Sequence, residues 1–321
     1  MHSLIHKKKI ISLMETNKYS VIGIMSGTSC DGLDLTFCDF WKKNNSWFYK
    51  LKYCKSIEYK NPLKNKLIDC YKMNGLELKK LDIELGEFIT EMVDKFQNKY
   101  KINADLISTH GHTVFHDVKE KISHQIGNPF ILYERIKKPV IYNFREMDVI
   151  TGGQGAPLVP FGDLELFNEY NYCVNIGGIL NITENNKENL IAYDICPANI
   201  ILNYYCRKIG FDYDKDGKIS STGNIDSNIL FKLNEIEYYK NKGPKSLDIQ
   251  KIEKLYFPIL MKQKPRNILQ TFIVHMGYQL NKAIKKNNSK VLLTGGGVFN
   301  KNLLKSIEEY NKLGHKYILP D

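Results

Sequence analysis

The sequence predicts an α/β protein made of two halves, each with a mixed β-sheet flanked by helices. Residues 20–40 and residues 171–184 carry this prediction, because each places β-rich runs on both sides of glycines, as in a strand–turn–strand unit. Further strand and helix patterns follow each unit, so the same order occurs twice. At 321 residues the chain is long enough for two medium domains.

In the first half, residues 79–100 repeat apolar side chains at helical spacing and predict a long helix. Strands are predicted at 104–109 and 140–144. The first ends in Thr109-His-Gly-His-Thr-Val-Phe-His116, and the second in Arg145-Glu-Met-Asp148. Because functional loops in α/β folds follow the carboxyl ends of strands, both strand ends are candidate site walls.

In the second half, the elements alternate again. We expect a strand at 190–193, a helix at 199–209, a helix at 267–285, a strand at 290–293 and a glycine turn at 295–297. The glycine-rich run 151–160 is predicted to cross between the halves. The expected domains are an N-terminal extension at 1–19, a first domain at 20–155 and a second at 156–321.

Composition narrows the class of partner. The formal net charge is +11, but only four of the 46 basic residues are arginine, and proteins that read nucleic acid depend on arginine forks. No nucleic-acid partner is therefore expected. No apolar run approaches the roughly 20 residues of a membrane helix. The seven cysteines form no C-x-x-C pair and indicate buried thiols in the cytoplasm.

The opening turn, Gly23 to Gly32, is either a tight hairpin turn or a phosphate loop. Small residues let backbone N–H groups and hydroxyls converge on an anion, but the spacing matches neither Walker A nor G-x-G-x-x-G. Asp31 and Asp34 could hold Mg²⁺ or its waters beside such a loop. Together with the turns at 175–181 and 295–297, this turn resembles the ATP clamp of actin-like ATPases and sugar kinases.

Asp194 is the acid–base candidate. It stands at the end of a predicted strand, just before a helix, where a carboxylate can accept a proton from a hydroxyl or a water. The alternative is that Asp194 caps the helix.

Two other polar patterns favour structural roles over metal binding. His110, His112 and His116 lack a Cys or acidic ligand at zinc spacing, so contacts to a sugar or a structural turn are favoured. The run 211–219 resembles the start of a calcium-binding loop, but the loop's twelfth position is Gly223 instead of Glu, which favours an acidic turn.

Arg145 follows a predicted strand directly, and its guanidinium could bind a planar carboxylate or form a surface salt bridge.

The chain resembles the anhydro-N-acetylmuramic acid kinase family, in the actin-like sugar kinase superfamily. The resemblance runs from residue 20 over nearly the whole chain, with motifs in the family's order. They are Gly23 to Gly32, Thr109 to His116, Gln125 to Pro129, Asn143 to Asp148, Gly152 to Pro160, Asn175 to Gly178, Tyr213 to Gly217, Pro244 to Ser246 and Gly295 to Asn300.

This resemblance implies two actin-like (ribonuclease H-like) domains around a central nucleotide cleft. It implies that ATP and water convert 1,6-anhydro-N-acetylmuramic acid to N-acetylmuramic acid 6-phosphate, in peptidoglycan recycling, with Asp194 as the base on the water. The sugar contacts would be His110, Arg145 and Asp148, and Asp31 would hold Mg²⁺ through water. The implied ATP contacts are Gly23, Ser26, Gly27, Thr28, Ser29, Asp31, Gly32, Gly177, Gly178, Gly295, Gly296 and Gly297. A homodimer is also implied.

Three departures from the family pattern leave rival interpretations. The usual Asp-Thr-Gly-Pro-Gly-Asn is here Asp194-Ile-Cys-Pro-Ala-Asn199, His112 replaces a common glutamine, and the family normally continues beyond Asp321 with a helical segment that carries acidic contacts. The rivals are another actin-like sugar kinase and a catalytically inactive protein that binds nucleotide or sugar.

Overall fold

The computed structural model describes residues 18–27, 30, 32–155, 158–186, 190–241, 244–261 and 263–320. The chain divides into two units, Met1–Leu158 and Val159–Asp321. The sequence analysis placed its domain boundary between residues 155 and 156. No helix in the described ranges is both long and apolar enough to cross a membrane.

The first unit is built on a six-stranded mixed sheet. Its strands are β1 (Lys18–Ser26), β2 (Gly32–Lys43), β3 (Ser46–Glu58), β4 (Leu106–Asp117), β5 (Ile122–Ile126) and β6 (Val140–Ile141). The sheet order is β3-β2-β1-β4-β5, and β6 pairs with β4. The meander β1–β2–β3 is antiparallel, whereas β4 runs parallel to β1 and β6 parallel to β4.

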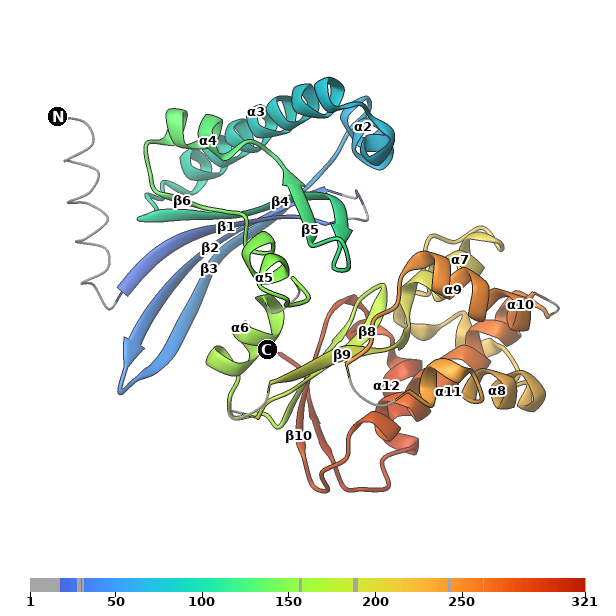
Figure 1. The fold of residues 1–321 in the computed structure, drawn as a ribbon. Coiled ribbons are helices and arrows are strands. Elements are labelled where there is room, and N and C mark those ends of the chain that lie inside the picture. Colours follow the sequence, from blue (N-terminus) through green and yellow to red (C-terminus); the bar gives the residue numbers. More distant parts are fainter. Residues whose placement is uncertain are drawn as a thin grey trace. The chain divides into compact units, whose positions relative to one another are not determined.

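One long helix covers a face of this sheet (Figure 1). The helices of the unit are α2 (Leu63–Asp69), η1 (Cys70–Lys72), α3 (Gly75–Tyr100), α4 (Pro129–Ile136) and α5 (Glu146–Ile150). Asn74 begins α3 with a capping box, since its side chain accepts from the Glu77 N–H while the Glu77 side chain accepts from the Asn74 N–H. The buried face of α3 follows the i, i+4 spacing of Leu81, Leu85, Ile89 and Val93.

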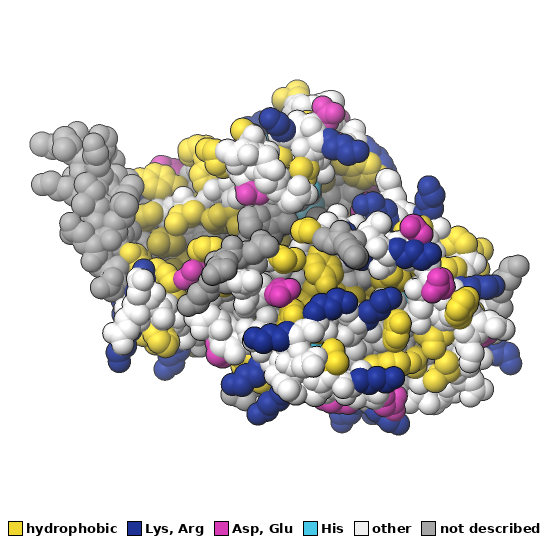
Figure 2. All heavy atoms as spheres, turned by 60° about the horizontal axis from the view of Figure 1, so that its bottom comes forward, with side chains coloured by type: hydrophobic (Ala, Val, Ile, Leu, Met, Phe, Trp, Pro, Cys, Tyr) yellow, Lys and Arg dark blue, Asp and Glu magenta, His cyan; other side chains and the backbone are white. Residues whose placement is uncertain are grey.

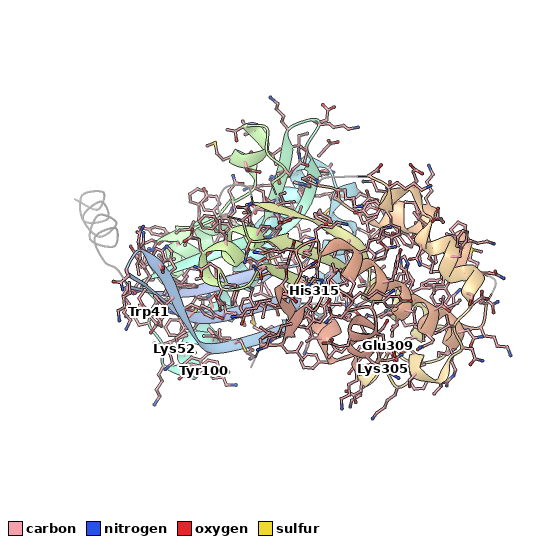
Figure 3. The ribbon with its side chains drawn as sticks, turned by 90° about the horizontal axis from the view of Figure 1, so that it is seen from below. Trp41, Lys52, Tyr100, Lys305, Glu309 and His315 are labelled. Carbon is pink, nitrogen blue, oxygen red and sulfur yellow. The ribbon has the colours of Figure 1, made fainter. Side chains whose placement is uncertain are left out.

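The outer strands of this sheet carry an exposed aromatic surface. Trp41 stacks on Phe48 with ring centroids 5.9 Å apart, and Tyr53 stacks on Tyr100 at 4.3 Å. Trp41, Lys52 and Tyr100 come from β2, β3 and the end of α3 and lie in one region of the unit (Figure 3). β3 is an edge strand, and most of its residues are exposed.

The second unit repeats the strand order of the first. Its strands are β7 (Tyr172–Ile176), β8 (Ile179–Glu184), β9 (Ile191–Pro197), β10 (Lys290–Thr294) and β11 (Lys316–Ile318). The meander β7–β8–β9 is antiparallel, and β10 and β11 follow in parallel on the other side of β7. β7, β8, β9, β10 and β11 therefore match β1, β2, β3, β4 and β6 in order and direction.

Helices pack against the second sheet around the buried helix α11 (Figure 1). The helical segments are α6 (Leu158–Leu166), α7 (Asn199–Arg207), η2 (Lys215–Gly217), η3 (Ser220–Thr222), α8 (Ser227–Asn234), η4 (Glu237–Tyr239), α9 (Ile249–Leu255), α10 (Phe257–Leu260), α11 (Pro265–Ala283), η5 (Gly296–Phe299) and α12 (Lys301–Glu309). Phe272, Ile273 and Met276 of α11 are fully buried in the core of this unit. On the face shown in Figure 2, the Lys and Arg side chains are spread among apolar and uncharged ones.

The predicted fold class, two α/β units with mixed sheets flanked by helices, is confirmed. The two strand–turn–strand units and the long helix α3 are present as predicted. Three strand ends were predicted wrongly. β6 does not reach residue 144 but ends at Ile141. β4 does not end at Thr109 but continues to Asp117, because its second half pairs with β5. β9 does not end at Tyr193 but continues to Pro197, paired with β8.

Candidate functional site

The opening turn joins β1 to β2 in the first unit. Gly32 has no room for a side chain, because an added Cβ would press on the carbonyl of Ile57 and lie 3.2 Å from the Glu58 Cα. At Gly23 an added Cβ would lie 2.8 Å from the Thr36 Oγ1. Of the predicted phosphate contacts, Thr28, Ser29 and Asp31 lie outside the described residues.

Ser26 ends β1 with a fully buried side chain. Tyr59 donates its phenol O–H to the Ser26 Oγ at 2.8 Å, and the Ser26 Oγ lies 3.2 Å from the His112 Nδ1. The Cys30 Sγ lies 3.9 Å from the other ring nitrogen of His112. The Ser26 hydroxyl is therefore engaged inside the unit.

His110 and Arg145, two of the predicted sugar contacts, are bonded directly to each other. The Arg145 Nε–H donates to the His110 Nε2 at 2.7 Å, which leaves the ring proton on the Nδ1, 3.0 Å from the Gly111 carbonyl. Burial lowers the pKa of His110, and the Arg145 charge lowers it further. His110 is thus a neutral acceptor at pH 7.

The third predicted sugar contact, Asp148, joins them through the backbone of Gly155. The Gly155 N–H donates to the Asp148 Oδ2 at 2.6 Å, and the Gly155 carbonyl accepts from the Arg145 Nη1. Gly155 has a φ of +63°, and an added Cβ would lie 2.6 Å from the Val149 Cγ2. The structure therefore brings all three predicted residues together around one glycine.

A cavity of about 240 Å³ lies beside His110 in the first unit, between β4, β5 and the segment before α5. Two polar atoms of residues that line it, the Thr109 Oγ1 and the Gln125 Oε1, are buried without a hydrogen-bond partner among the described residues. Both atoms are shielded from water, so they lie in the wall of the site without facing the cavity itself. The sequence analysis missed both residues as site candidates, although each stands in a family motif.

In the second unit, two glycine turns meet at the end of β7. The Gly178 carbonyl accepts from the N–H groups of Ala198 and Ile200, at 2.9 and 3.1 Å, where α7 begins. Gly295 has a φ of +84°, and an added Cβ at Gly295 or Gly297 would collide with Ile176. Only glycine lets the 295–297 turn approach β7 this closely.

A cavity of about 470 Å³ is lined by Gly296 and Gly297 on one side and by Tyr213 and Asp216 among others. The acidic run at 211–219 is therefore a cavity wall, a role that sequence reasoning missed. Within this run, the Asp214 carboxylate is hydrogen-bonded inside the protein. It accepts from the Ile219 N–H at 2.7 Å and from the Asn300 Nδ2 at 3.2 Å. No group of three or more His, Cys, Asp or Glu suited to a metal occurs in the described part of the chain.

Asp194 lies within β9, three residues before its end. The Leu247 N–H donates to the Asp194 Oδ2 at 2.8 Å, and the backbone of Asp194 is held by the Lys245 carbonyl at 2.9 Å and the Tyr238 hydroxyl at 2.6 Å. Burial raises the pKa of Asp194, while the Leu247 N–H and Lys251 act in the opposite direction. The alternative prediction, that Asp194 caps the following helix, is wrong, because the N-cap residue of α7 is Ala198.

The residues that depart from the family pattern after Asp194 point into the core. Cys196 and Ala198 are fully buried among the apolar side chains of the second unit. Their side chains therefore occupy core volume, and the strand that carries Asp194 stays paired with β8.

The repeated mixed sheets and the glycine turns at strand ends define the actin-like class of α/β proteins. Residues 19–314 match the sequence profile described as anhydro-N-acetylmuramic acid kinase. The chain belongs to this family.

Individual relatives agree with the profile. An anhydro-N-acetylmuramic acid kinase of Pelagibacter ubique is 32% identical over 314 residues, covering 91% of this chain and 83% of the relative. One from Caldanaerobacter subterraneus is 28% identical over 337 residues, covering 94% and 85%. Among solved structures, component A of the Acidaminococcus fermentans (R)-2-hydroxyglutaryl-CoA dehydratase aligns with a TM-score of 0.46 at 9% identity, covering 94% of this chain and 91% of that one.

Proposed function

We propose that this chain is an ATP-dependent kinase that hydrolytically opens 1,6-anhydro-N-acetylmuramic acid and phosphorylates O6, giving N-acetylmuramic acid 6-phosphate and ADP. The match of residues 19–314 to the family carries this proposal. The site geometry of each unit supports it and suggests which residues do which part of the work.

The nucleotide is proposed to bind against glycine turns. Gly177, Gly178 and the 295–297 turn meet at the end of β7, and at Gly296 an added Cβ would meet nothing within 4 Å, so this backbone is open to close approach by a ligand. The cavity beside Gly296 and Gly297 suits the nucleoside. In the first unit the opening turn, with Gly23, Gly27, Thr28, Ser29 and Gly32, is proposed to hold phosphate oxygens.

Mg²⁺ is proposed as the accompanying cation, held through water by Asp31. When bound, it would neutralise charge on the phosphates.

The sugar is proposed to occupy the cavity beside His110 in the first unit. The lining residues His110, Asn128 and Asn143 carry polar groups suited to its hydroxyl and amide groups. Arg145 and Asp148 do not line this cavity, and they are proposed to set the position of His110 and Gly155 beside it.

Asp194 is proposed as the general base. All hydrogen bonds from described residues to its carboxyl go to Oδ2, so Oδ1 can accept a proton from water. As Asp194 takes that proton, the water oxygen bonds to C1 and the C1–O6 bond breaks. O6 then takes the γ-phosphoryl group, ADP leaves, and the proton on Asp194 returns to solvent. Burial raises the pKa of Asp194, which makes it a stronger base than an exposed aspartate.

A coupled ADP-release assay with the anhydrosugar tests the function. We expect ADP and phosphorylated sugar to form in equal amounts, and only when both substrates are present. Turnover of an ordinary hexose without turnover of the anhydrosugar would favour another actin-like sugar kinase. Binding of nucleotide or sugar without product would favour an inactive relative.

The role of Asp194 is tested by Asp194→Asn, which keeps the shape but removes the base. We expect turnover to fall by at least about 100-fold, in line with the usual contribution of a general base, with nucleotide affinity largely retained. Glu253→Gln is the matched control, because it removes an exposed carboxylate from α9 of the same unit. Undiminished turnover in Asp194→Asn would exclude this role.

The homodimer and the cytoplasmic location stay predictions from the sequence. Light scattering of the purified chain measures the first.

A further inference from the structure

A row of buried polar side chains lies under the opening turn of the first unit. Tyr59, Ser26, His112 and Cys30 are between 0% and 3% exposed, so water does not reach them freely. They come from different elements, since Ser26 ends β1, Tyr59 follows β3, His112 lies in β4 and Cys30 lies in the turn itself. The proposed mechanism uses none of their side chains for contact with a substrate.

The hydrogen bonds in this row have a defined direction. Because Tyr59 donates to the Ser26 Oγ at 2.8 Å, the Ser26 proton is left for the His112 Nδ1, 3.2 Å away. The ring proton of His112 then lies on Nε2, which is 3.9 Å from the Cys30 Sγ. Burial lowers the pKa of His112, so the ring is neutral at pH 7 and its Nδ1 can accept.

His112 therefore contacts the opening turn at Ser26, at Cys30 and at the Gly27 backbone, and it also hydrogen-bonds to the backbone of Leu67 outside the turn. The turn is also closed by its own backbone, because the Cys30 N–H donates to the Gly27 carbonyl at 3.1 Å. Cys30 has a φ of +53°, in the left-handed region that residues other than glycine seldom adopt. A buried ring between Ser26 and Cys30 is well placed to hold this conformation.

We propose that His112, supported by Tyr59 through Ser26, is a positioning residue that holds Ser26, Gly27 and Cys30 of the opening turn in place for binding of the phosphates of ATP. This inference rests on the proposed function of the turn. It also changes the part expected of Ser26, whose hydroxyl anchors the turn from below instead of contacting phosphate. A core histidine with no bearing on nucleotide is the competing explanation.

Three variants and one control separate these explanations. His112→Ala removes all the ring contacts, to Ser26, Cys30 and the backbone of Gly27 and Leu67. His112→Gln restores an amide that can accept from Ser26, and Tyr59→Phe removes only the phenol O–H. His315→Ala is the control, since His315 is also a buried histidine but belongs to the second unit (Figure 3). The readouts are the affinity for a non-hydrolysable ATP analogue by calorimetry, and KM for ATP and for the anhydrosugar.

We expect His112→Ala to weaken analogue binding and raise KM for ATP by about 10-fold, equivalent to about 1.4 kcal/mol, with KM for the sugar unchanged. His112→Gln should return to within about threefold of the unchanged protein, and Tyr59→Phe should lose about threefold. If His112→Ala does not fold, Tyr59→Phe keeps the test open, because it changes a single hydroxyl.

The inference is overturned if His112→Ala and Tyr59→Phe bind the analogue as well as His315→Ala does, or if His112→Gln is as impaired as His112→Ala. Failure of the unchanged protein to bind the analogue would be a different result. It would remove the proposed function of the turn, and this inference with it.

Discussion

Single backbone positions organise both candidate sites. Gly155 joins Asp148 and Arg145 through its N–H and carbonyl, and Arg145 in turn fixes His110. In the second unit, Gly295 and Gly297 allow the 295–297 turn to pack against the end of β7. In each case the absence of a side chain allows the contact.

Gly297 and its neighbour offer a matched test of this point. An added Cβ at Gly297 would collide with the Ile176 side chain, whereas at Gly296 nothing lies within 4 Å. We expect Gly297→Ala to lower the free energy of unfolding by about 1–3 kcal/mol through overpacking, and Gly296→Ala to change it by less than about 1 kcal/mol. Urea unfolding measures both. Equal losses would show that the turn relaxes away from Ile176.

His275 on α11 predicts an acid-sensitive stability. Its Nδ1 donates to the Asn234 Oδ1 at 2.8 Å and its Nε2 accepts from Tyr239 at 2.7 Å, so the folded ring is neutral. Complete burial lowers its pKa to about 3, against about 6.5 in the unfolded chain. Below pH 6.5 the unfolded state therefore binds the proton more readily, and stability falls as pH falls.

The expected loss from this histidine between pH 7 and pH 5 is about 2 kcal/mol, from about 1.4 kcal/mol per pH unit below the unfolded pKa. Urea unfolding at the two pH values measures it. His275→Gln should lose that part of the pH dependence while keeping the rest. An identical slope in both proteins would show that protonation of His275 is not the cause.

At the scale of elements, the sequence predicted the helices and turns that depend on the local pattern of residues. The apolar spacing of residues 79–100 gave the helix α3, and the glycines at 27, 32, 177 and 178 gave the turns of both hairpins. It did not predict how far β4 and β9 run. Those lengths depend on pairing with β5 and with β8, and pairing is a tertiary property.

The site was predictable to the same extent. The family resemblance implied His110, Arg145 and Asp148 as sugar contacts, and the structure brings the three together, while their contact with a sugar stays a prediction. That they meet through Gly155 was not predictable, because it requires the left-handed backbone there. Leu247, whose N–H donates to the Asp194 carboxylate, lies 53 residues away in the sequence, so no local pattern could predict this hydrogen bond.

The capping box of α3 yields a prediction at this scale. Asn74→Ala removes the side-chain acceptor for the N–H groups of Leu76 and Glu77, and should cost about 1 kcal/mol of unfolding free energy. Asn74→Ser keeps an acceptor and should cost much less. Denaturant unfolding distinguishes them, and equal stability of the two variants would contradict a role for the cap.

For the whole molecule, the proposals assign the nucleoside to the second unit, the sugar to the first unit, and the phosphates to glycine turns of both. Hydrogen exchange tests this assignment. An ATP analogue alone should protect amides of η2 and η5, because residues of both segments line the proposed nucleoside cavity. The anhydrosugar alone should protect amides of β4 and β5. Protection of β4 and β5 by the analogue, without protection of η5, would reverse the assignment.

The equal strand order of the two units bears on the history of the chain. Duplication of one ancestral half would leave this pattern, with each copy keeping its hairpin turn after the first strand. The third strands have since diverged. β9 carries Asp194, whereas β3 is an exposed edge with aromatic and lysine side chains. After such a duplication only one copy needed a carboxylate for the proposed role of Asp194 on that strand, which left the other free to acquire a different surface.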